Sequence, residues 1–147
     1  MTPPTIRPAI VDDAAELARL ITPVGHPVTE ADVRAKWDAF TAEGNSAFVL
    51  EGPESLLGVI TLHHMVVLHR PKPVGRITFL AIDESVRNRG YGRALVEAAE
   101  GAFRRVGCGM VEVTSHARRS SAHEFYRRIG YEQTSFRFAR VLPDIDD

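Results

Sequence analysis

Residues 86–95 read VRNRGYGRAL, and the interpretation of the whole chain starts from this stretch. Two glycines stand one residue apart, Arg87, Arg89 and Arg93 surround them, and an apolar run follows. Glycine permits a positive φ and lets main-chain N–H groups approach a ligand, because no Cβ is in the way. A helix start adds partial positive charge. The stretch therefore fits either a cradle for a polyanion or a plain turn with solvated charges.

The residues on either side predict a strand–turn–helix unit. RITFLAI (residues 76–82) is typical of an apolar central strand, and apolar residues at helical spacing predict a helix over 93–106 that ends at Gly-Cys-Gly. A phosphate-binding turn occupies such a position. The stretch is no P-loop, because it lacks Gly-Lys-Ser/Thr, and it lacks the third glycine of the dinucleotide fingerprint. Spacing alone leaves open a pyrophosphate site and an ordinary strand–helix connection.

The other segments predict an α+β domain with a mixed sheet. Further strands are expected at 5–10, at two places within 46–67 that a Gly-Pro turn joins, at 110–115 and at 136–142. Further helices are expected at 12–21, with Asp13 and Glu16 as a capping pair, after Thr29, and from a Ser121–Glu124 capping box to Gly130. We expect one domain over residues 1–142 and a flexible acidic tail over 143–147.

Composition narrows the classes of function. The 147 residues carry a net charge of −1, which argues against non-specific nucleic-acid binding. Cys108 is the only cysteine, so no disulfide framework is expected. No apolar run approaches the roughly 20 residues of a membrane span, and no signal peptide is evident, so we expect a cytoplasmic protein without a membrane partner. Residues 1–75 hold six Lys/Arg against nine Asp/Glu, whereas residues 87–140 hold eleven arginines against five acids, which favours an anion in the later half.

Two motifs together resemble the GNAT superfamily of acetyl-CoA-dependent N-acetyltransferases. R-x-x-G-x-G, after FLAIDESV and before RALVEAAEG, looks like that family's acetyl-CoA signature. SSAHEFYRRIGY (residues 120–131) resembles the family's Ala-x-x-Phe-Tyr-x-x-x-Gly-Phe/Tyr helix at matching separation. The likeness covers residues 46–142 and, more loosely, 5–21. It implies a mostly antiparallel mixed sheet of about six to seven strands, splayed at the acetyl-CoA strand, with about four flanking helices.

The resemblance also implies acetyl-CoA as co-substrate. The strand before the turn would pair with the pantetheine arm through Leu80, Ala81 and Ile82, with an oxyanion-binding N–H near Ile82. The pyrophosphate would be wrapped by the residues of the turn, which are Arg87, Asn88, Arg89, Gly90, Tyr91, Gly92 and Arg93. Arg119 stands where many relatives have asparagine, and either CoA binding or solvation accounts for it.

Two residues are candidates for moving protons. Tyr126 matches the tyrosine that in many relatives protonates the departing CoA thiolate, although its position beside Phe125 also suits a core tyrosine. A phenol of pKa near 10 and a thiol near 8.5 make that transfer uphill by roughly 2 kcal/mol, so the tyrosine should help without being indispensable. Glu112 aligns with a strand glutamate that some relatives use as base. Its alternation with two valines leaves a solvated strand position open, and a relayed water is another base.

The acceptor side is less defined. His63, His64 and Trp37 are candidates for contact with the substrate, and Trp37 also suits the core. Adjacent histidines on a strand point to opposite faces, so a metal site is not expected. We expect an acetyltransferase that acts on a small-molecule or peptide amine by direct attack in a ternary complex. No nucleic-acid partner is expected, and the oligomeric state is left open between a monomer and a homodimer. The alternative is an acyl-CoA-binding sensor without chemistry on the same fold.

Overall fold

The computed structural model describes residues 3–25, 27–114 and 120–143, apart from the side chain of Ser120. The chain divides between Val113 and Thr114 into two units. None of the described helices is long and apolar enough to cross a membrane.

Five strands of the first unit form one mixed sheet in the order β1-β2-β3-β4-β5. They are β1 (Thr5–Pro8), β2 (Asn45–Glu51), β3 (Leu56–Met65), β4 (Val74–Ile82) and β5 (Met110–Val113). Neighbouring strands run antiparallel, except that β5 lies parallel to β4. Parallel neighbours need a crossover connection, which α3 (Tyr91–Arg105) supplies. The mixed, mostly antiparallel sheet predicted from the sequence is confirmed.

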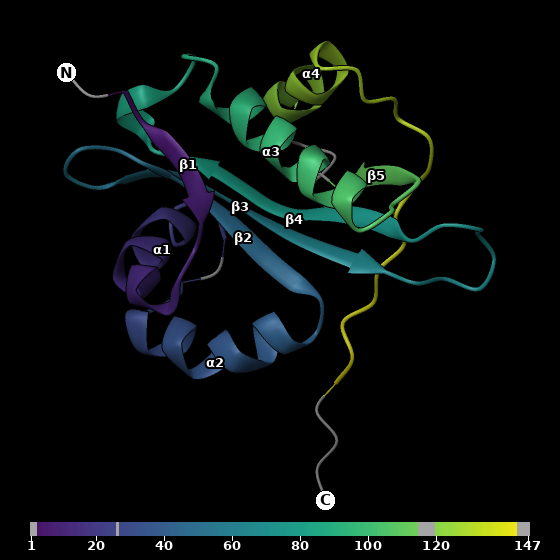
Figure 1. Cartoon of the computed structure of the whole chain (residues 1–147), viewed down its shortest axis with the longest axis horizontal. Coiled ribbons are helices and arrows are strands. Elements are labelled where there is room, and N and C mark those ends of the chain that lie inside the picture. Colours follow the sequence, from purple (N-terminus) through teal and green to yellow (C-terminus); the bar gives the residue numbers. More distant parts are fainter. Residues whose placement is uncertain (1–2, 26, 115–119, 144–147) are drawn as a thin grey trace, which may run out of the picture. The chain divides into compact units, whose positions relative to one another are not determined.

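Helices of the first unit cover both faces of this sheet (Figure 1). A 3-10 turn, η1 (Val11–Asp13), leads into α1 (Ala14–Ile21), and α2 (Glu30–Ala42) follows. These two helices lie on one face and α3 lies on the other. The approach of α3 is close, because a Cβ on Gly75 of β4 would stand 2.6 Å from the Phe103 ring.

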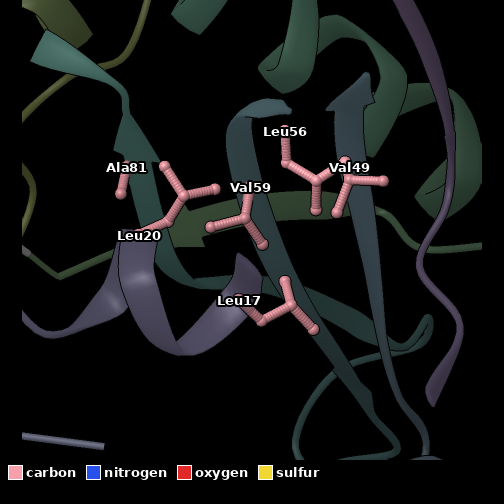
Figure 2. Close-up of a cluster of buried hydrophobic side chains, with 6 residues drawn as sticks. All are labelled: Leu17, Leu20, Val49, Leu56, Val59 and Ala81. Carbon is pink, nitrogen blue, oxygen red and sulfur yellow. The ribbon is translucent and has the colours of Figure 1, made fainter. Parts of the chain in front are cut away.

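The face under α1 carries a cluster of buried hydrophobic side chains (Figure 2). The members of this core cluster are Leu17, Leu20, Val49, Leu56, Val59 and Ala81. Val33 and Trp37 of α2 and Phe79 of β4 pack against it. Complete burial of a Leu or Val side chain contributes about 1.5–3 kcal/mol, so the cluster fixes α1 firmly against β2, β3 and β4.

The two predicted helix caps near the N-terminus have different outcomes. Thr29 caps α2 as predicted, because its Oγ1 accepts from Asp32 N at 3.1 Å while the Asp32 carboxylate accepts from Thr29 N at 2.9 Å. The capping pair of Asp13 and Glu16 is wrong, since Asp13 makes no side-chain cap hydrogen bond to α1. Its carboxylate accepts instead from both terminal nitrogens of Arg7, each at 2.9 Å. A bidentate guanidinium is a stronger hydrogen-bond partner for a carboxylate than a main-chain N–H group at a helix start.

The described part of the second unit contains the helix α4 (Ser120–Arg128). The predicted start at a Ser121–Glu124 capping box is wrong, because Ser121 already lies within the helix. The spacing of Ser121 and Glu124 fits a capping box, but a helix that already includes Ser120 keeps the same apolar stripe.

Residues 136–142 are not a strand, so that prediction is also wrong. Phe136 and Phe138 are 84% and 93% exposed. Among the described residues no strand pairs with this segment, and Arg140 interrupts the side of an extended chain that carries both phenylalanines. The described residues therefore form five strands, against the six to seven expected.

Candidate functional site

β4 has two neighbouring strands, and it extends beyond its pairing with one of them, β5. β5 pairs with β4 from Val74↔Met110 to Ile77↔Val113, whereas β3 pairs with β4 as far as Ile82. Among the residues that the structure describes, no strand covers the β5 side of β4 after Ile77. An uncovered edge presents N–H and C=O groups with which an extended ligand can pair.

The alternation of the antiparallel ladder identifies the residues that face this edge. Asp83 N donates to Leu57 O at 2.8 Å, so the main chain of Asp83 faces β3. Because this direction alternates along a strand, Ala81 also faces β3, while Leu80 and Ile82 face the uncovered edge. Of the three residues predicted to hold the pantetheine arm, Leu80 and Ile82 offer main-chain groups there. Ala81 does not, and its side chain belongs to the core cluster.

A β-bulge lies where β4 parts from β5. The register passes from Thr61↔Phe79 to Leu62↔Ile77, so Thr78 has no register partner on β3. The hydroxyl oxygens of Thr61 and Thr78 lie 2.6 Å apart. A bulge bends its strand and increases the local twist. β4 is therefore bent at the residue where its pairing with β5 ends.

The glycine-rich stretch forms a turn between β4 and α3. After a 3-10 turn, η2 (Glu84–Val86), the chain adopts a positive φ at Asn88 (63°) and at Gly90 (83°). α3 begins directly afterwards, with Tyr91 and Gly92 in its first turn. The N-cap is Gly90, so no side chain at that position caps the first N–H groups of the helix. A Cβ on Gly90 would meet no atom within 4 Å, so the space beside the helix start at this residue is open.

Three exposed arginines surround this turn. Arg87 Nε donates to Ile82 O at 3.4 Å, and Arg93 Nε donates to Glu97 at 3.2 Å on the surface of α3. The Arg89 side chain is exposed as well. Uncapped helix N–H groups and guanidinium groups are the donors that bind a phosphate. The residues of the turn therefore fit the diphosphate of CoA.

An arginine of α1 anchors the start of this turn. Arg19 donates to Asp83 Oδ2 and to Leu56 O, each at 2.7 Å, and to Glu16 Oε2 at 2.8 Å. Asp83 also accepts from Ser85 N at 3.0 Å and from Ser85 Oγ at 2.7 Å. These hydrogen bonds, with Arg19 first, lower the pKa of Asp83 from 3.8 to about 2. This anchor is not evident from the sequence, because residues 64 positions apart leave no local pattern.

The anchor predicts a pH dependence of stability. A carboxyl whose pKa is lowered on folding stabilises the folded state above its unfolded pKa, and this stability is lost as pH falls through the folded pKa. For Asp83 the window runs from 3.8 down to about 2. We expect thermal unfolding scans to show a smaller fall in Tm across this window for Asp83→Asn than for the wild type. Equal falls would contradict the prediction.

Glu112 lies on β5 opposite an arginine of β4. Arg76 and Glu112 are register partners, and Arg76 Nε and Nη2 donate to Glu112 Oε1 at 2.8 and 2.5 Å. The Arg76 and Glu112 side chains are 42% and 35% exposed. Glu112 is thus a member of an ion pair rather than a lone solvated carboxylate. Its role as a base stays a prediction.

The end of α4 holds the ring of Tyr126. Tyr131 N donates to Tyr126 O at 2.9 Å and Gly130 N donates to Arg127 O at 3.1 Å, with Gly130 at φ 100°. These bonds form a Schellman motif, and the predicted end of the helix at Gly130 is confirmed. The Tyr126 ring centroid lies 5.1 Å from that of Phe125 and 5.8 Å from that of Tyr131.

The chemistry open to Tyr126 follows from its burial. Desolvation raises the pKa of the Tyr126 phenol above its usual 10. The phenol is therefore protonated at neutral pH, and it can donate a proton but not accept one there. A tyrosine in the core has the same aromatic contacts, so its role as a general acid stays a prediction.

The structure separates the three acceptor-side candidates. His63 is in register with Arg76, and its buried Nδ1 has no hydrogen-bond partner among the described residues. His64 lies beside the turn at Gly44, whose carbonyl accepts from His64 N at 3.4 Å. Trp37 packs against the core cluster, as the core interpretation predicts. Within the described residues, no group of three or more His, Cys, Asp or Glu side chains could hold a metal ion. Arg119 lies outside these residues.

Comparison with known proteins assigns the family. The sequence profile of the acetyltransferase (GNAT) family matches residues 11–131, a range that includes β4, the glycine turn, α3 and α4. This chain belongs to the GNAT family of acetyltransferases. The predicted family and enzyme class, that of the acyltransferases, are confirmed.

Two curated GNAT relatives match part of the chain. An aminoalkylphosphonate N-acetyltransferase of Salmonella typhimurium is 34% identical over 87 residues, which are 59% of this chain and 56% of that protein. A mycothiol acetyltransferase of Rhodococcus erythropolis is 28% identical over 130 residues, which are 80% of this chain and 42% of that protein. The chain thus spans about half the length of the curated relatives that it matches.

A solved structure agrees on the fold. An aminoglycoside N-acetyltransferase in complex with CoA superposes with a TM-score of 0.82 at 16% identity, over 94% of each chain. The α+β GNAT fold predicted from the sequence is confirmed.

Proposed function

We propose that this protein transfers an acetyl group from acetyl-CoA to a primary amine of a small molecule or peptide, by direct attack in a ternary complex. One arrangement carries the proposal: a strand with an uncovered edge leads through a turn to an open, positively charged helix start. The helix start suits a diphosphate, and the strand edge suits an extended arm that contains amide groups. CoA contains both, joined in that order.

The direction of β4 supports one orientation for such a ligand. With the diphosphate at residues 88–93, the arm runs back along β4 from Ile82 toward Thr78, a span of about 13 Å at ~3.3 Å per residue. The thioester then comes near the bulge, and Leu80 offers the uncovered N–H closest to it. We therefore place the oxyanion at Leu80 N, two residues from the position near Ile82 expected from the sequence. A donor aimed at developing charge contributes several kcal/mol to catalysis.

Two proton transfers complete the reaction. The amine nitrogen attacks the thioester carbonyl, the C–N bond forms, the C–S bond breaks, and the sulfur leaves with its electron pair. We assign the proton that this sulfur takes up to Tyr126, and the proton that the amine loses to Glu112, directly or through water. A lysine-like amine requires about 3 pKa units to be neutral at pH 7, whereas an α-amine requires about one. The need for a base therefore depends on the acceptor.

The name of one curated relative supports the choice of acceptor class. The Salmonella typhimurium relative is named for aminoalkylphosphonates, which are small amines. We propose a small amine of this kind as the first substrate to test. We also propose that residues 1–142 act as one acetyltransferase domain. A cytoplasmic location and a homodimer stay predictions from the sequence.

The proposal is tested by thiol release from acetyl-CoA in the presence of 2-aminoethylphosphonate, spermidine, glycine or a peptide with a free N-terminus. We expect release with at least one of these amines, together with the acetylated product by mass spectrometry. CoA alone should stabilise the fold by about 2.7 kcal/mol at one hundred times its Kd.

Two outcomes would contradict this function. Stabilisation by CoA without thiol release from any amine would indicate the acyl-CoA-binding sensor. Absence of both would indicate that the turn at residues 88–93 is an ordinary strand–helix connection.

A further inference from the structure

A row of polar side chains crosses the sheet beside the bulge. His63 of β3, Arg76 of β4 and Glu112 of β5 are register partners, and partners in a sheet project from the same face. Gly75 and Ile77, which alternate with Arg76, belong to the opposite face, where Gly75 meets Phe103 of α3. The row therefore lies on the face that carries α1 and α2.

This row interrupts an apolar face. On the same face of β3, Thr61 lies two residues from His63 and is hydrogen-bonded to Thr78. Val59 lies two residues beyond Thr61 and is buried in the core cluster. In the other direction the next register row on the same face consists of Met65, Val74 and Met110. An ion pair as exposed as that of Arg76 and Glu112 contributes only about 0–1 kcal/mol to stability. Stability alone gives little reason for charged side chains at this place.

The geometry of the ion pair is one-sided. Arg76 directs both Nε and Nη2 to a single oxygen, Glu112 Oε1. Among the residues that the structure describes, Glu112 Oε2 receives no hydrogen bond. A carboxylate held at one oxygen presents the other in a fixed direction, which suits a second cationic donor.

We propose that Arg76 is a positioning residue of the acceptor subsite: it holds the Glu112 carboxylate through Oε1 so that Oε2 receives the ammonium group of the acceptor. The inference rests on the proposed function. Arg76 stands two residues before Thr78, so the ammonium comes to the end of the uncovered edge where the thioester is proposed to lie. Arg76 touches neither the acetyl group nor the amine and acts through Glu112.

Steady-state kinetics of the full chain test this role, with whichever of 2-aminoethylphosphonate, spermidine, glycine or the free peptide gives thiol release. We expect Arg76→Ala to raise KM for the amine about tenfold, because a positioned charged contact is lost, with KM for acetyl-CoA unchanged within about twofold. Arg76→Lys should recover part of the loss, since its ammonium still donates to Oε1. Arg34→Ala removes a similarly exposed ion pair on α2, with Glu30, and should change neither constant.

A double-mutant cycle separates positioning from a structural effect. If Arg76 acts through Glu112, the pair Arg76→Ala/Glu112→Gln should have the amine KM of Glu112→Gln alone. Additive effects, an unchanged amine KM in Arg76→Ala, or an equal rise in both KM values would overturn the inference. Glu112→Gln and Arg76→Lys keep the test decisive if Arg76→Ala does not fold. Failure of the wild type with every amine would overturn the proposed function, and the acceptor subsite with it.

Discussion

Replacement of Gly90 by valine is expected to weaken CoA binding about a hundredfold, whereas the same replacement at Gly107 should leave it unchanged. Gly90 has φ 83° and stands at the N-cap of α3, where a side chain would project into open space. It lies at the helix start whose N–H groups have no side-chain cap, where we propose that the diphosphate binds. Hydrogen bonds to a charged group contribute about 1.5–3 kcal/mol each, so loss of one or two accounts for the hundredfold effect.

Gly107 is a matched control for backbone strain. It also has φ 83°, a Cβ there would also meet no atom within 4 Å, and it follows the C-terminal end of the same helix. Both valine variants therefore carry a similar cost for a side chain in the left-handed region, about 1–2 kcal/mol. Calorimetric titration with CoA and thermal unfolding measure the two effects separately. Equal CoA affinities for the two variants would contradict a diphosphate site at residues 88–93.

The elements of the fold were predictable where a local pattern specifies them. β4, α3 and their turn were predicted because an apolar run, two glycines and a helical stripe are all readable in one stretch of sequence. The strand predicted at residues 136–142 is absent from the structure, since an extended pattern becomes a strand only where another strand pairs with it. Asp13 failed as a cap for a related reason. Its carboxylate accepts from Arg7 on β1, a contact that spacing along the chain does not reveal.

The candidate site was likewise predictable only where a local pattern specifies its residues. The residues of the turn follow from a motif, and the alternation at Glu112 placed it on a strand. Arg76 and Thr78 were missed, because their interest depends on the register of β4 with its two neighbours and on a bulge. The sequence does not distinguish Ala81 from Leu80 and Ile82, because it does not say which main-chain groups of a strand face which neighbour. Only the ladder shows that.

Tyr126→Phe is expected to lower kcat at least tenfold while acetyl-CoA binds as before. General acid catalysis typically contributes 10²–10⁴-fold, and transfer from a phenol to a thiolate is uphill by roughly 2 kcal/mol, so the effect should lie near the lower end of that range. Burial raises the pKa of the Tyr126 phenol further, which makes it a weaker acid but keeps it protonated throughout the assay range. Single-turnover kinetics with saturating acetyl-CoA measure the chemical step directly.

Tyr131→Phe is the control for this experiment. Tyr131 lies in the same unit, its ring contacts that of Tyr126, and its substitution also deletes one phenolic hydroxyl. A general packing effect would lower activity in both variants, whereas loss of an acid affects Tyr126→Phe alone.

A thioester substrate with a more acidic leaving group gives a second test of this role. A thiolate whose thiol has a lower pKa needs less protonation, so such a substrate should recover turnover in Tyr126→Phe. If turnover of Tyr126→Phe equals that of the wild type, the proton comes from elsewhere and Tyr126 serves only to pack the end of α4.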